Sequence, residues 1–113
     1  MRRVLHEVVE EALRELADES MQRELWLSIG KSDVSSLTES ISRLLDDSGL
    51  GDALDSAQVV YDPEIDEQLR QLGDALANID DARPPETVLD DPDLQRVREL
   101  AAALLLALRQ YPG

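Results

Sequence analysis

Apolar residues recur at three- and four-residue steps in four stretches of the chain, which is the spacing of one face of an α-helix. The stretches are residues 2–19, with an extension to 29 as the alternative, then 34–48, 63–79 and 92–109. We therefore predict an all-α fold, a small antiparallel four-helix bundle-like domain with short loops. The most regular pattern belongs to the third stretch, with Ile65, Leu69, Leu72, Leu76 and Ile79.

Sequence signals for helix starts support three of these helices. Serine or aspartate at an N-cap accepts a hydrogen bond from the backbone, and proline fits the first helical position. The proline-rich residues 82–86 are expected to break any helix. The start signals are Ser36 with Glu39 as a capping box, Asp62 with Pro63, and Asp91 with Pro92.

Two short segments leave the secondary structure open. Residues 25–29, LWLSI, fit either the end of the first helix or a short strand with alternating side chains. The helix is favoured because neither Gly nor Pro occurs before Gly30. Residues 51–61 fit one short helical turn and then a minor extended segment near residues 58–61.

The composition suits a single acidic helical domain over residues 1–113. Hydrophobic residues make up 42% of the chain, close to the average of globular proteins, and phenylalanine is absent. The core must therefore be aliphatic, and its leucine and alanine favour helix. Trp26 is expected in the core, with a role as a binding anchor as the alternative. The chain has no cysteine, which excludes disulfides and thiolate metal sites.

The longest apolar run, residues 100–108, is too short to span a bilayer, which needs about 20 residues. We see no export signal and expect a cytoplasmic protein. The run is apolar around the whole helix, so it is either the central helix of the bundle or a helix covered by a second chain. In the second case a homodimer would use Leu100, Leu104 and Leu106.

Residues 44–55, LLDDSGLGDALD, hold four aspartates and two glycines but fail the pattern of a calcium loop. An EF-hand loop needs oxygen ligands at positions 1, 3 and 5, and counting from Asp46 puts Leu50 at position 5. The stretch is better interpreted as a helix end. Gly49 would adopt the left-handed conformation after the last turn, with Leu50 packed against Leu45. No metal site is predicted.

Negative charge is concentrated in the middle of the chain. The net charge is −14, and residues 44–93 carry two basic and fifteen acidic groups, a net of −13. Loops clustered at one end of the bundle would focus this potential, although charge that only confers solubility is the alternative. Two aspartate pairs are expected at helix C-termini, where the helix dipole disfavours them. Salt bridges to Arg43 and Arg83 are one explanation, and a partner that binds the carboxylates is the other. The pairs are Asp46–Asp47 and Asp80–Asp81.

Residues suited to catalysis are sparse. His6 is the only histidine and is expected on the surface or packed against a helix. Without a second histidine or a cysteine, a nucleophile–base pair or a zinc site would be unusual. No glycine-rich phosphate loop follows a strand. The strong negative charge opposes binding to nucleic acid or to an anionic membrane. We predict no enzyme activity, no catalytic residues and no cofactor.

These observations favour a small acidic, non-catalytic protein-interaction module that docks electrostatically on a basic partner protein. Inhibitors, immunity proteins and antitoxins work in this general way, which is an analogy of class and not of motif. A self-associating structural or assembly protein that uses its apolar last helix is the alternative. The residues expected to bind the partner are Asp46, Asp47, Asp52, Asp55, Asp80 and Asp81.

Overall fold

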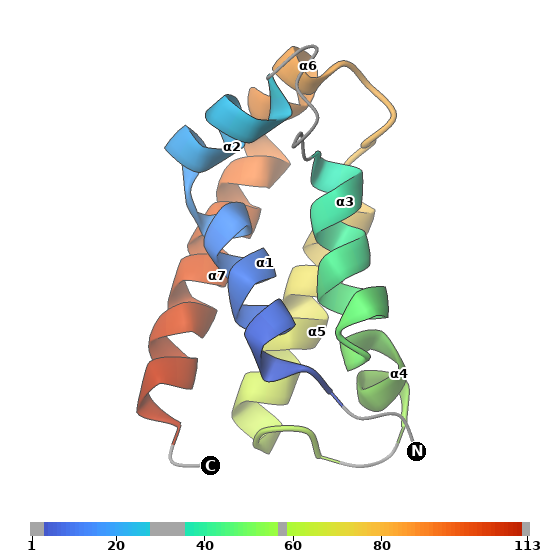
Figure 1. Ribbon diagram of the computed structural model, residues 1–113, viewed down its shortest axis with the longest axis vertical. Helices are drawn as coiled ribbons and strands as arrows, with labels where there is room; N and C mark the ends of the chain where they lie inside the picture. Colours follow the sequence, from blue (N-terminus) through green and yellow to red (C-terminus); the bar gives the residue numbers. More distant parts are fainter. Residues whose placement is uncertain (1–3, 28–35, 57–58, 112–113) are drawn as a thin grey trace.

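Helices form all the regular secondary structure in the part of the chain that the computed structural model describes, residues 4–27, 36–56 and 59–111. Four longer segments alternate in direction, with α1 and α5 running one way and α3 and α7 the other, so the all-α bundle prediction is confirmed (Figure 1). The elements are α1 His6–Ala17, α2 Glu19–Trp26, α3 Leu37–Ser42, the π-helical turn η1 Arg43–Asp47, α4 Leu50–Asp55, α5 Pro63–Ala77, α6 Pro85–Leu89 and α7 Pro92–Gln110.

The first predicted helix is two helices. Asp18 has extended backbone angles and accepts a hydrogen bond from the Met21 N–H at 3.1 Å, so it ends α1 and caps α2. The predicted continuous helix therefore breaks where the apolar pattern changes phase. α1 begins at His6, later than expected, because the Leu5 N–H bonds to the Ser48 carbonyl oxygen at 2.7 Å.

The second predicted helix is α3 followed by η1, and we call Leu37–Asp47 the α3–η1 segment. Ser36 caps it through a 3.1 Å bond from the Glu39 N–H, as predicted. Gly49 has a φ of 81°, which confirms the expected left-handed residue after the helix end. The Leu50 N–H bonds to the Ser48 hydroxyl at 3.1 Å, and α4 begins there at once.

α5 and α7 start as predicted, each with a capping aspartate followed by proline. The Asp62 carboxylate accepts a 2.7 Å bond from the Ile65 N–H, and Asp91 accepts one from the Asp93 N–H at 2.8 Å. α5 extends from residue 63 to 77 and α7 from 92 to 110, within two residues of the expected bounds.

α6 was not predicted, because residues 82–86 were expected to break any helix. That expectation was wrong beyond Pro84. Pro85 occupies the first position of α6, where the missing N–H of proline costs no hydrogen bond. Val88 and Leu89 are buried, and α6 packs on α2.

The two segments left open by the sequence contain no strand among their described residues. Leu25 and Trp26 lie in α2, so the helical interpretation holds for them, while residues 28 and 29 lie outside the described part. Of the extended segment expected near 58–61, residue 58 lies outside the described part, and residues 59–61 do not belong to a sheet. The buried Asp66 carboxylate binds the N–H groups of Val60 and Tyr61 at 2.8 and 3.0 Å, which satisfies donors that a strand would pair.

α7 packs against both α1 and α5 and lies at one edge of the bundle, on the left in Figure 1. Every helix contributes to one hydrophobic core, which is mainly aliphatic and includes Trp26 at 6% exposed, as predicted. None of the helices in the described part is both long and apolar enough to cross a membrane. The fully buried larger apolar side chains are Val9, Leu13, Leu16, Leu44, Leu50, Leu69, Leu72, Leu94, Val97 and Leu104.

Candidate functional site

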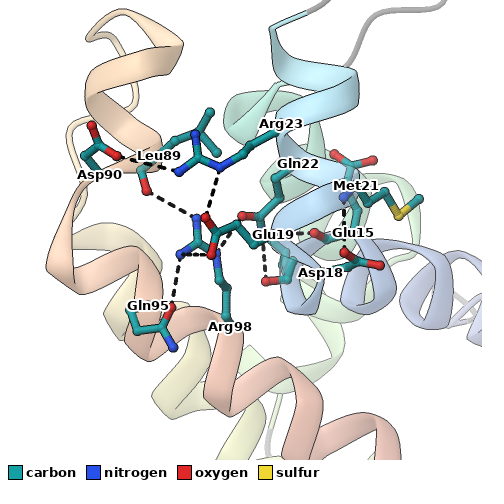
Figure 2. Close-up of polar contacts among 11 residues, drawn as sticks. Glu15, Asp18, Glu19, Met21, Gln22, Arg23, Leu89, Asp90, Gln95 and Arg98 are labelled. Carbon is teal, nitrogen blue, oxygen red and sulfur yellow. Dashed lines mark hydrogen bonds and ion pairs between the residues drawn. The ribbon is translucent and has the colours of Figure 1, made fainter.

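Gln22 joins α1, α2 and α7 from a fully buried position. Its amide nitrogen donates to the carbonyl oxygens of Glu15 and Leu16 at 3.0 and 2.8 Å, which the last turn of α1 leaves without helical partners. Its Oε1 accepts a 2.8 Å bond from Nε of Arg98 on α7 (Figure 2). Gln22 thus caps α1 and connects that cap to α7.

Arg98 is a buried cation whose contacts are all within the protein. Its side chain is 9% exposed, and it also donates to the Leu89 carbonyl oxygen at 3.2 Å and to Gln95 Oε1 at 3.1 Å (Figure 2). Glu19 lies 3.7 Å away and partly balances the charge. Burial lowers the pKa of the Arg98 guanidinium, and the Glu19 carboxylate opposes this shift.

Glu15 forms a second buried centre, at 2% exposed. Its carboxylate accepts a 2.9 Å bond from the Trp26 indole N–H and a bond from the Ser40 hydroxyl. Arg43 Nη1 lies 3.4 Å from its other oxygen. The predicted Arg43–Asp47 pair is therefore wrong, because Arg43 points inward to Glu15. This carboxylate holds α2 and the α3–η1 segment to α1.

We refer to the contacts around Gln22, Arg98 and Glu15 as the buried polar network. Among the described residues, no buried side-chain nitrogen or oxygen lacks a hydrogen-bond partner. A buried charge is stable only when paired and hydrogen-bonded, and here those partners come from the protein itself. The polar groups of the buried polar network therefore act as structural links between helices. A surface that serves a partner would lie elsewhere on the molecule.

His6 is exposed and packs on Tyr61, as expected for a histidine at a helix start. Its Nδ1 lies 2.9 Å from the Tyr61 hydroxyl, and the Tyr111 hydroxyl donates to the Tyr61 carbonyl oxygen at 2.8 Å. Burial raises the pKa of Tyr61 to about 12, with Glu10 as the next cause. These contacts join the start of α1, the start of α5 and the end of α7.

The predicted partner-binding aspartates fall into two groups at opposite ends of the α3–η1 segment. Asp46, Asp47, Asp52 and Asp55 form the η1–α4 group, and all four are exposed. No cation among the described residues lies within ion-pair distance of Asp46 or Asp47. These two occupy the last turn of η1, where the dipole disfavours them, as the sequence indicated.

Asp80 and Asp81 form the second group, in the loop between α5 and α6. The Asp80 carboxylate accepts a 3.1 Å bond from the Ala82 N–H, and Asp81 accepts a 2.7 Å bond from the Thr38 hydroxyl at the start of α3. These hydrogen bonds give both aspartates a structural role that neither of the two explanations from the sequence included. The predicted Arg83–Asp81 salt bridge is wrong, because Arg83 pairs with Asp91.

Thr38 and Asp46 are separated by about two helical turns, roughly 12 Å along the axis. The two groups of aspartates therefore do not gather at one end of the bundle, and α4 and the α5–α6 loop lie at opposite ends (Figure 1). The expected focusing of charge at one end is not found. The acidic segment instead extends from α4 at one end of the bundle, through α5, to α6 at the other end (Figure 1).

The leucines expected at a dimer face are divided between the core and the surface. Leu104 is 1% exposed and belongs to the core of its own chain, so it cannot form such a face. Leu100 is partly buried, and Leu106 is 56% exposed. α7 is not a fully covered central helix either, because it packs against α1 and α5 but leaves Ala102, Ala103 and Leu106 exposed.

An apolar groove lies between the α3–η1 segment and α5. α5 packs mainly on α7, and no comparable packing joins it to the α3–η1 segment in the described structure. The groove is open to solvent and has a volume of about 230 Å³. The sequence patterns did not predict it, because each helix has its own regular apolar face. The lining residues are Ile41, Leu45, Gly73, Leu76, Ala77, Ile79 and Asp81.

Within the described residues, no three histidine, aspartate or glutamate side chains are placed to hold a metal ion. Searches against known protein families, curated proteins and solved structures gave no match. The function is therefore argued from the residues and their geometry.

Proposed function

We propose that the protein is a small acidic, non-catalytic interaction module that docks electrostatically on a basic surface of a partner protein. The observation that carries this proposal is the use of the two basic residues in segment 44–93. Arg70 donates to the Leu54 carbonyl oxygen at 3.2 Å, and Arg83 pairs with Asp91. Arg70 therefore binds a backbone carbonyl and not a carboxylate. Arg83 does pair with a carboxylate, but that carboxylate already caps α7.

The Arg83–Asp91 pair shows how a carboxylate is used when it serves the fold. The Arg83 hydrogen bond holds the pKa of Asp91 below its usual value, and the Asp93 N–H adds to this effect. Among the described residues, Asp46 accepts only a long 3.5 Å bond from the Ser42 hydroxyl, and neither Asp46 nor Asp47 pairs with a cation. Exposed carboxylates of this kind raise the rate of encounter with a basic protein, and a steered association slows as salt increases.

The proposal includes the cytoplasmic location expected from the sequence. Nucleic acid and anionic membranes are poor partners for a chain with a net charge of −14. An inhibitor, an immunity protein or an antitoxin is the kind of role that this mechanism suits. Self-association through α7 is the weaker proposal, because Leu104 is in the core and leaves Leu106 as the exposed leucine of that face.

The test uses a partner that the wild-type protein retains from an extract of its own organism at low salt. Once purified, its association rate is measured with the wild type and with the double variant Asp46→Asn, Asp47→Asn. We expect the variant to slow association by about three- to tenfold at low salt, and the difference to shrink at 1 M salt, where screening acts within about 3 Å.

A variant with the same charge change on another face, Glu11→Gln with Glu99→Gln, serves as the control, since both glutamates are exposed. The aspartate variant should fold and be as stable as the wild type or slightly more stable, because an unfavourable contact with the helix dipole is removed. Equal association rates for the two variants would contradict the proposal. So would clear destabilisation by the aspartate changes with unchanged binding.

A further inference from the structure

The groove between the α3–η1 segment and α5 has a polar contact between its walls at each end. At one end the Thr38 hydroxyl donates to Asp81, and at the other Arg70 of α5 donates to the Leu54 carbonyl oxygen in α4. Between these ends no hydrogen bond or ion pair of the described residues links the groove's apolar lining. Both walls are thus fixed in position while the middle stays unfilled.

The middle of the groove has room for side chains from outside. Gly73 lies in α5, and a Cβ atom added there would meet nothing within 4 Å. Ala77, one turn later, is exposed, while Ile41 and Leu45 of the opposite wall are only partly buried. Gly73 and Ala77 leave space on the α5 wall, and the branched aliphatic side chains of the lining make the groove a shallow apolar seat.

Negative charge borders this seat. Asp81 lines one end of the groove. The chain as a whole carries a net charge of −14. A ligand that fills the groove therefore meets apolar side chains in the middle and a carboxylate at one end, on a strongly acidic protein.

We propose that this groove binds an amphipathic helix of the basic partner, with aliphatic side chains in the groove and lysine or arginine on its flanks. The inference rests on the proposed function and names the contact that gives that docking its specificity. Helix-in-groove recognition needs an apolar trough and no backbone pairing, and the described structure offers no strand edge to which a peptide could add.

Other occupants fit less well. The volume is below the roughly 300 to 1,000 Å³ of typical small-molecule pockets, and the groove is open. A second copy of the chain would bring its own net charge of −14 against the acidic border, so like charges would oppose it. A basic helix meets both the apolar lining and the charge.

The π-helical turn η1 supplies an independent reason to look at this wall. π turns are rare and occur frequently at functional sites. Here the Ser48 N–H bonds to the Arg43 carbonyl oxygen at 3.2 Å, five residues earlier, and the turn contains the groove residue Leu45.

The test uses a synthetic helix of roughly 18 residues, long enough to form several turns. It carries leucine at three- and four-residue steps and lysine on both flanks. A second peptide has the same composition in scrambled order. The backbone amide signals of the full-length protein are followed by NMR as each peptide is added. We expect saturable shifts at Ile41, Leu45, Gly73 and Ala77 with the first peptide and not with the scrambled one.

Gly73→Leu fills the groove with a side chain that meets no neighbour at its Cβ position, so the protein should stay folded. We expect the Kd of this variant for the amphipathic peptide to be about tenfold higher than that of the wild type. Ala102→Leu places the same side chain on the exposed face of α7 and should leave binding unchanged.

The outcomes separate the two proposals. If both peptides bind equally, and Gly73→Leu has no effect while salt weakens binding, the groove inference is overturned and the electrostatic function stands. If neither peptide binds at low salt, both proposals lose their support. Sedimentation that shows a dimer abolished by Gly73→Leu would assign the groove to a second copy of the chain and overturn the inference.

Discussion

Where α1, α2 and α7 meet, charged and polar side chains turn inward and are satisfied by the protein, whereas between the α3–η1 segment and α5 they turn outward and leave an apolar gap. Arg98 is the example on the first side, with bonds to Gln22, Gln95 and Leu89. On the second side, Asp81 lines the groove and Asp46 of η1 is exposed to solvent. Charged groups on the first side stabilise the fold, whereas the exposed carboxylates on the second side are not needed for it.

The two sides also differ in how their helices are joined. The buried polar network links α1, α2, α6 and α7 through side chains at the centre of their contacts (Figure 2). Among the described residues, the polar links across the groove are at its ends, through Thr38 with Asp81 and Arg70 with Leu54. A surface for a partner is more readily built where packing inside the chain is incomplete.

The largest effect should come from removing the cation of the buried polar network. Arg98→Ala leaves Gln22 Oε1 and the Leu89 carbonyl oxygen buried without their donor, and we expect the free energy of unfolding to fall by about 3 kcal/mol. Urea unfolding measures this change. Arg96→Ala, at an exposed position of the same helix, should change it by less than about 0.5 kcal/mol. Equal effects of the two changes would show that the network does not carry stability.

Replacing two glycines of the acidic segment 44–93 by alanine should change the stability of the protein in opposite directions. Gly49 has a φ of 81°, so Gly49→Ala should destabilise the protein by about 1 to 2 kcal/mol. Gly73 lies in the middle of α5 with open space around it, so Gly73→Ala should stabilise by about 0.5 to 1 kcal/mol. Thermal unfolding of both variants tests the pair. Destabilisation by Gly73→Ala would mean that the groove is more closed than described.

The smallest effect on stability at neutral pH is expected for a change at Tyr61. This residue lies near the start of α1 and the end of α7, away from the buried polar network. Its pKa is raised to about 12 in the folded protein, against about 10 in the unfolded chain. Between these values the unfolded state loses its proton first, so this contribution to stability is complete below pH 10 and is lost as the pH rises toward 12.

Urea unfolding between pH 9 and pH 11.5 follows this decline. Tyr61→Phe should remove this part of the loss of stability and the late tyrosinate absorbance step. Tyr111→Phe keeps that step, because its hydroxyl binds a backbone carbonyl and not His6. A late step that survives in Tyr61→Phe would assign it to another group.

The sequence was sufficient to predict the long helices, because each depends on local patterns. Asp62 with Pro63 marks the start of α5, and the left-handed Gly49 follows from the helix end before it. The break at Asp18 was visible only as a change of phase. It depends on Gln22, which caps α1 from the next helix, and no local rule places a glutamine side chain there.

The partners of charged residues were predicted poorly. Arg43 and Asp47 have ideal helical spacing, yet Arg43 binds Glu15, which lies 28 residues earlier. The hydrogen bond from the Thr38 hydroxyl to the Asp81 carboxylate was not predicted either. Such contacts depend on how helices pack, and sequence spacing says nothing about them. The groove was unpredictable for the same reason, since it arises from two helices that do not pack together.

The packing of α1 against α7 has a consequence for the order in which the chain can fold. α1 begins at residue 6 and α7 ends at residue 110, so the contact that covers the apolar face of α1 joins opposite ends of the sequence. Closing so long a loop costs entropy before any contact repays it. During synthesis from the N-terminus, α1 can first pack on α2 and the α3–η1 segment, but its contact with α7 has to wait for almost the whole chain, whereas α5 and α7 can pair as neighbours.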